Sequence, residues 1–119
     1  MIATEMVTAH YQGMAAKPDS LLPSPLQSEM RPERIGHRMM LLREALELRP
    51  AQISDMLGVE RTYWSRFENG KRPITDSFAA LLVDRFGITL DFLILGRWSG
   101  LPLELADKMR AVESRSKNS

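Results

Sequence analysis

Cysteine is absent from this chain, and its charges almost cancel, with 16 Lys and Arg against 15 Asp and Glu. Without cysteine there is no disulfide framework, no thiolate nucleophile and no zinc finger. No apolar run approaches the roughly 18 residues that a membrane span needs, and the N-terminus lacks the basic start and apolar stretch of a secretory signal. We therefore expect one small domain with tails, no membrane contact and a cytoplasmic location.

The patterns that support catalysis or metal binding are also missing. The chain has no nucleophile–base pair, no glycine-rich phosphate loop and no paired carboxylates at a catalytic spacing. His10 and His37 have no neighbouring histidine or carboxylate at metal-ligand spacing. The sequence therefore predicts that the protein is not an enzyme, and it predicts no metal and no cofactor.

Composition divides the chain into three parts. Residues 1–30 show no sustained apolar period, are interrupted by prolines and carry a net charge of −2, which predicts a disordered tail. Residues 31–97 carry eleven Arg or Lys against nine Asp or Glu and hold the periodic segments. Residues 98–119 are expected to form a short amphipathic helix that begins at Pro102, followed by a disordered tail from Ser114.

The central part predicts an all-α fold of five helices, to which the amphipathic helix adds a sixth. Apolar residues recur at helical spacing, and threonine caps, prolines at helix starts and glycines at helix ends mark the boundaries. In the second helix Ile53, Met56 and Leu57 are expected to face inward. The five expected helices are 32–48, 50–57, 61–69, 76–86 and 90–95.

The most informative unit is the pair of helices on either side of Gly58. A short glycine turn sets two helices at a steep angle, so the first turns of helix 61–69 should project from the surface. Trp64 and Phe67 would face inward, while Arg61 and Arg66 face outward and present planar forks that match guanine O6 and N7. Basic residues gather here, since Arg61, Arg66, Lys71 and Arg72 fall inside twelve residues.

Residues 35–96 resemble the phage repressor and Cro family of helix-turn-helix domains, the XRE type. The resemblance is carried by R-x-x-L-x-L, then L-G-V and S-R-F-E-N-G-K-R-P, and finally F-G-I-T-L-D-F-L-I-L-G, in this order and spacing. It implies a bacterial or phage regulator that binds double-stranded DNA with helix 61–69 in the major groove, at the nucleoid.

The resemblance also implies roles for individual residues. Arg43 would pair with Glu68 and tie the first helix to the recognition helix. The base-contacting positions match Arg61, Thr62 and Arg66. The family commonly starts its second helix with a phosphate-contacting glutamine, but Pro50 stands there, so Arg49 is expected to contact phosphate instead. Together with the outward-facing residues of the helix, the expected phosphate contacts are Arg49, Tyr63, Ser65, Asn69, Lys71 and Arg72.

The small size of the domain indicates which partners to expect. One such domain reads only a few base pairs, so we expect a homodimer on a pseudo-palindromic site. The dimer contact would come from the helix around residues 103–112, or from Phe92 and Leu95. The N-terminal tail or the last helix would be free to contact RNA polymerase or a co-regulator.

Two functions remain open from the sequence alone. A sequence-specific transcriptional regulator is the first, and repression is favoured over activation because it requires only occupancy of a promoter. The alternative is a helix-turn-helix scaffold that serves as a protein-interaction module, or as a co-activator subunit that contacts the transcription machinery. The two differ in whether the basic side chains are needed, because DNA binding depends on them.

Overall fold

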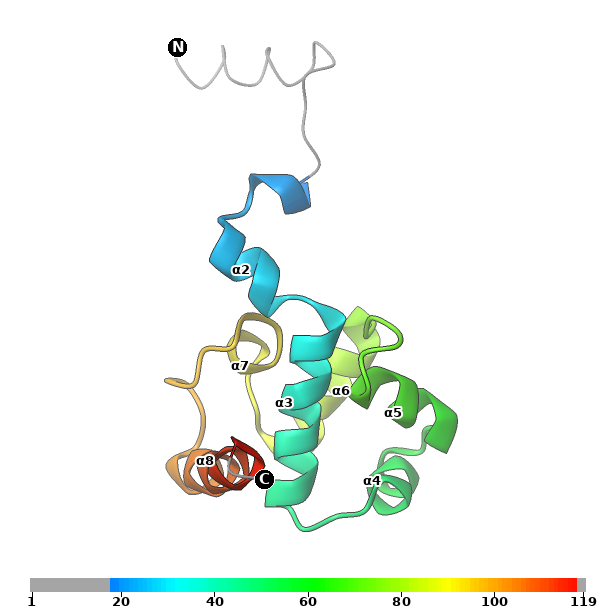
Figure 1. Cartoon of the computed structure of the whole chain (residues 1–119). Helices are drawn as coiled ribbons and strands as arrows, with labels where there is room; N and C mark the ends of the chain where they lie inside the picture. Colours follow the sequence, from blue (N-terminus) through cyan, green and yellow to red (C-terminus); the bar gives the residue numbers. More distant parts are fainter. Residues whose placement is uncertain (1–17, 118–119) are drawn as a thin grey trace, which may run out of the picture.

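The computed structural model describes residues 18–117, and every regular element in that part of the chain is helical (Figure 1). This confirms the all-α prediction for the described residues. The elements are η2 (Pro18–Leu21), α2 (Ser24–Glu29), α3 (Pro32–Ala45), α4 (Pro50–Leu57), α5 (Arg61–Glu68), α6 (Asp76–Phe86), α7 (Leu90–Leu95) and α8 (Leu103–Lys117).

Helix α3 lies at the centre of the arrangement, with α5 on one side and α7 and α8 on the other (Figure 1). Its buried residues include Met39, Leu41 and Leu42, none of which has any exposed surface. Trp64 of α5 and Leu82 of α6 are equally buried and complete this core. The helix-turn-helix pair α4 and α5 therefore stands on a packed base formed by the other helices.

Local chemistry accounts for the boundaries of α6 and α7. Thr75 Oγ1 accepts a hydrogen bond from the Phe78 amide at 3.1 Å, and Thr89 Oγ1 accepts one from the Phe92 amide at 2.9 Å. These bonds satisfy amides that the first turn of a helix leaves without a partner. At the other ends, Gly87 and Gly96 adopt left-handed conformations with φ of 74° and 73°. The predicted caps are present at both helices.

The expected disordered tail over residues 1–30 is wrong for residues 18–30, whereas residues 1–17 lie outside the described part. Helix α2 is held by Arg38, whose Nη1 donates to the Glu29 and Leu93 carbonyl oxygens, both at 2.9 Å. Arg38 Nη2 also pairs with the Glu29 carboxylate. Burial lowers the pKa of Arg38, and the Glu29 charge opposes that shift. One buried guanidinium thus joins α2, α3 and α7.

Three further expectations on the helices need correction. The first helix ends at Ala45 and not near residue 48, because Glu47 turns the chain with a left-handed φ of 58°. Met56 is 54% exposed and does not face the core as expected, although Ile53 and Leu57 do. The last helix continues through the expected tail as far as Lys117; residues 118–119 lie outside the described part.

The surfaces expected to form the dimer contact are largely occupied within the chain itself. Met109 is fully buried and Val112 is 3% exposed, because α8 packs its apolar face on α3. Phe92 is also fully buried, with its ring edge-on to Trp98 at 5.0 Å between centroids. Helix α8 thus covers an apolar face of α3 within the same chain. Neither the buried face of α8 nor Phe92 is therefore available to a second copy.

Within residues 18–117, no helix has the length and apolarity needed to cross a membrane.

Because Arg38 lies close to α7, substitution of two glycines with the same conformation should cause different losses of stability. A Cβ at Gly96 would lie 2.7 Å from Arg38 Nη2, whereas a Cβ at Gly87 would meet nothing within 4 Å. Gly87→Ala should lower the free energy of unfolding by about 1 kcal/mol through backbone strain alone. Gly96→Ala should lower it by about 2–3 kcal/mol, because it also displaces Arg38. Urea unfolding followed by circular dichroism measures both, and equal losses would contradict this role of Arg38.

Candidate nucleic-acid interface

The turn between α4 and α5 places the second helix of the pair at the surface. Gly58 ends α4 with φ 72°, and the Val59 amide donates to the Ser54 carbonyl at 3.0 Å. Ser54 is fully buried, and its hydroxyl donates to the Pro50 carbonyl at 2.7 Å, so this small side chain leaves no unpaired polar group between the two helices. The sequence therefore fixes the turn through one left-handed glycine and one small buried residue.

Side chains of α5 divide sharply between interior and solvent. Trp64 is fully buried and Phe67 is 6% exposed, while Arg61, Thr62, Ser65 and Arg66 are all exposed. The exposed set projects from one side of the helix, since positions three and four residues apart are neighbours on its surface. The residues expected to contact bases are therefore presented together, and none of them is needed to fill the core.

A buried ion pair fixes the C-terminal end of α5 to α3. Arg43 Nε and Nη2 donate to the two carboxylate oxygens of Glu68 at 2.7 and 3.0 Å, and Trp64 Nε1 donates to the same carboxylate at 2.6 Å. The hydrogen bond to Glu68 raises the pKa of Arg43, because it stabilises the charged guanidinium. The structure thus contains the pair between Arg43 and Glu68 that the family resemblance implied.

The backbones of α3 and α5 also approach each other closely at Gly36. A Cβ there would lie 2.3 Å from the Glu68 carbonyl oxygen and 2.6 Å from that of Phe67. Only a residue without a side chain fits this position. Gly36 therefore sets the distance between the two helices, and the Arg43–Glu68 pair sets their register.

The segment after α5 carries further basic side chains to the same surface. Asn69 Nδ2 donates back to the Ser65 carbonyl at 2.8 Å, and the Lys71 amide donates to the Arg66 carbonyl at 2.9 Å. Lys71 and Arg72 remain exposed. At the opposite end of the pair, the exposed Arg49 precedes α4, and its amide donates to Gln52 Oε1 at 2.8 Å. Positive groups thus follow the C-terminal end of α5 and precede the N-terminal end of α4.

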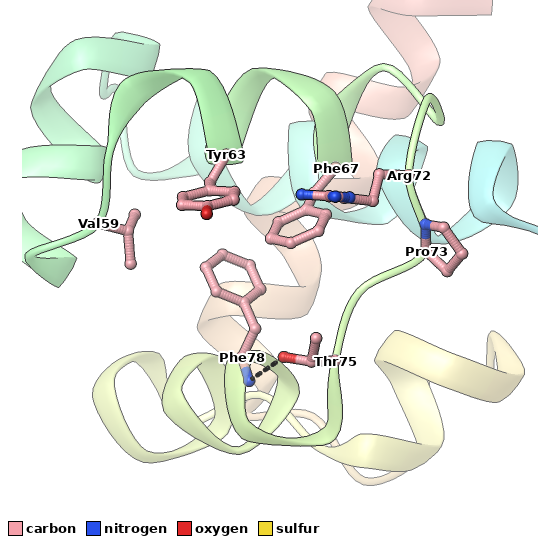
Figure 2. Close-up of a pocket in the computed structure, with 7 residues that line it drawn as sticks. All are labelled: Val59, Tyr63, Phe67, Arg72, Pro73, Thr75 and Phe78. Carbon is pink, nitrogen blue, oxygen red and sulfur yellow. Dashed lines mark hydrogen bonds between the residues drawn. The ribbon is translucent and has the colours of Figure 1, made fainter.

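Between α5 and α6 lies an apolar groove of about 580 Å³, shown in Figure 2. Tyr63 and Phe67 stack on one wall with centroids 6.3 Å apart, and Phe78 forms the facing wall. The Arg72 guanidinium lies along the rim, 5.9 Å from the centroid of the Tyr63 ring. Two expected phosphate contacts, Tyr63 and Arg72, are therefore placed side by side at the edge of the groove.

One contact of the recognition helix was not anticipated from the sequence. Arg61 Nη2 donates to Asp55 Oδ2 at 3.1 Å across the turn. The spacing of six residues is not a helical one, and only the geometry of the turn brings the two side chains together.

Within residues 18–117, no group of three or more His, Asp or Glu side chains could hold a metal ion.

Two helices joined by a short glycine turn, the second exposed and carrying basic side chains, are the arrangement of helix-turn-helix DNA-binding domains. A family model described as a helix-turn-helix domain matches residues 34–91. This region, from α3 to the start of α7, belongs to the helix-turn-helix family. Comparison with curated proteins and with solved structures gives no match.

The buried pair predicts a large loss of stability from a small change. Glu68→Gln keeps an acceptor for Trp64 but removes the charge that faces Arg43, whose side chain is only 11% exposed. The free energy of unfolding should fall by about 2–3 kcal/mol, because a partly buried guanidinium loses its counter-charge.

The matched control is Glu104→Gln in the pair with Lys108, where the glutamate side chain is 85% exposed. Exposed pairs contribute little, so that change should stay below about 0.5 kcal/mol. Urea unfolding followed by Trp fluorescence compares the two variants. Similar small losses in both would contradict the anchoring role of Glu68.

Proposed function

We propose that this protein is a sequence-specific transcriptional regulator that places α5 in the major groove of double-stranded DNA. The observation that supports this is the exposed strip of Arg61, Thr62 and Arg66 on a helix whose opposite side is anchored by buried residues. A rigid helix that displays donors and a hydroxyl can discriminate between the hydrogen-bonding patterns of the four base pairs. In this proposal these three residues contact base edges.

Flanking residues would fix the helix in the groove through the DNA backbone. Contacts to phosphate set register and orientation without reading sequence, and they come from basic, hydroxyl and amide side chains. Six exposed residues of this kind surround the base-contacting strip, at the start of α4, along α5 and in the segment that follows. They are Arg49, Tyr63, Ser65, Asn69, Lys71 and Arg72.

The regulator would act as a homodimer at the nucleoid. A single recognition helix covers only a few base pairs, so two copies on a two-fold site supply the length of sequence that selective binding requires. Repression by occupancy of a promoter is the mode we propose, because the domain needs no further surface for it. The exposed side of α8 is the part of the described chain best placed for a contact with polymerase or a co-regulator.

The groove of Figure 2 favours a second candidate function, an interaction module for another protein. Its walls are aromatic, and Tyr63 on its rim is 44% exposed. Binding of that kind would depend on the aromatic side chains and would tolerate loss of the arginines on α5. Selection of duplexes by wild type and by a variant without these arginines separates the two functions.

Selection from a random duplex library tests the proposed function directly. Wild type should enrich a short motif with two-fold symmetry. Arg61→Ala/Arg66→Ala should lose the motif and keep weak, salt-sensitive binding, because phosphate contacts persist without base readout. If wild type enriches no motif, the sequence-specific function is excluded and the interaction module takes its place.

Salt dependence tests the phosphate contacts separately. Lys71→Ala/Arg72→Ala should bind the selected duplex more weakly, with the same base preferences. The slope of log K against log salt concentration should fall in magnitude by about 2 per subunit, because each phosphate contact contributes about 0.9. Fluorescence anisotropy over a salt series measures the slope, and Lys108→Ala on the exposed side of α8 is the control that should leave it unchanged. An unchanged slope in the double variant would remove these residues from the interface.

A further inference from the structure

An acidic side chain of α4 lies against the first residue of the recognition helix. Asp55 Oδ2 accepts a hydrogen bond from Arg61 Nη2 at 3.1 Å, and the two side chains are 62% and 66% exposed. Since Arg61 is the first residue of α5, the pair sits at the end of the helix that would enter the major groove deepest. It therefore belongs to the surface that would face DNA.

Asp55 contributes little to the stability of the fold, and its charge does not increase the affinity for DNA. An ion pair as exposed as this one contributes little to stability, in contrast to the buried pair of Arg43 and Glu68. A carboxylate next to DNA is also repelled by the phosphates and weakens binding to any sequence. What Asp55 does change is the orientation of the Arg61 guanidinium.

Arg61 has enough donors to bind Asp55 and a base at the same time, so the orientation that Asp55 imposes can persist on DNA. The guanidinium has five N–H groups, and a bidentate contact to guanine O6 and N7 uses two of them. A hydrogen bond from Nη2 to Asp55 uses one more, so both interactions can exist at once. An arginine held in one plane loses less rotamer freedom on binding. Its planar fork fits the two adjacent acceptors of guanine better than it fits a base edge that lacks them.

We propose that Asp55 is a specificity-determining positioning residue that holds the Arg61 guanidinium in the orientation that reads guanine. This inference rests on the proposed function, since it requires that Arg61 contact a base. Asp55 touches no base itself and acts only through Arg61. Removal of its charge therefore changes which base is selected at one position, and not whether the protein binds DNA.

The test compares base preferences of wild type and Asp55→Asn by selection and by competition titration with duplexes that differ at one position. Asp55→Asn should reduce the preference for guanine at one position of each half-site by about 3- to 10-fold, a part of what a bidentate contact provides. Preferences elsewhere should be unchanged. Affinity for an unrelated duplex should stay the same or rise, because a negative charge has been lost.

Glu60→Gln is the matched control. Glu60 is exposed, immediately precedes Arg61 and forms no capping hydrogen bond with its side chain. Its substitution removes the same charge from the same region without touching the Asp55–Arg61 contact. The guanine preference should therefore persist in Glu60→Gln, and its loss there would show that general charge near the DNA, and not orientation by Asp55, sets the preference.

A double-variant cycle shows whether Asp55 acts through Arg61. In an Arg61→Ala background, Asp55→Asn should cause no further change at the guanine position. A further loss in that background, or full guanine preference in Asp55→Asn alone, overturns the inference. Circular dichroism should show both variants folded, because the side chains are exposed. If wild type selects no motif, the proposed function fails. If Arg61→Ala alters the motif and Asp55→Asn does not, only the inference fails.

Discussion

The orientation of the recognition helix depends on the contact between α3 and the C-terminal end of α5. Gly36 lets the backbones approach to a distance that no Cβ would allow, and the Glu68 carboxylate accepts hydrogen bonds from both Arg43 and Trp64. A close contact of this kind is tightly packed and tolerates little displacement. Because the buried side of α5 is fixed by these bonds, its exposed side carries residues that are free of any structural task.

A second polar centre extends the domain beyond the matched region. Arg38 satisfies carbonyl oxygens at the end of α2 and in the last turn of α7, where helix carbonyls have no partner within their own helix. A cation also interacts favourably with the negative end of the α7 dipole. This one side chain holds residues 24–30 against the domain, although the prolines that interrupt residues 1–30 are typical of a disordered segment.

The sequence predicted the helices and their caps well, because these signals are local. Thr75, Thr89 and the glycines that end α4, α6 and α7 act on residues within a few positions, so no knowledge of the fold is needed to interpret them. Arg43 and Glu68 were found through the family resemblance. Three features depend on the folded geometry: the contact of Asp55 with Arg61 across the turn, the order imposed by Arg38 and the burial of Met109. No spacing along the chain predicts them. Exposure of Met56 was missed for the same reason, since an apolar residue on a helix is interpreted as core unless its neighbours are known.

Two arginine–carboxylate pairs of similar chemistry show how burial assigns their roles on one helix. In the Arg43–Glu68 pair the side chains are 11% and 14% exposed, so water cannot replace either partner and the pair fixes the helix. In the Arg61–Asp55 pair they are 66% and 62% exposed, so the pair contributes little to the stability of the fold. The residues that stabilise the fold therefore lie at the C-terminal end of α5, whereas in the proposed function its N-terminal end contacts bases. Because of this separation, substitutions of the exposed residues at the N-terminal end of the helix should leave the fold intact.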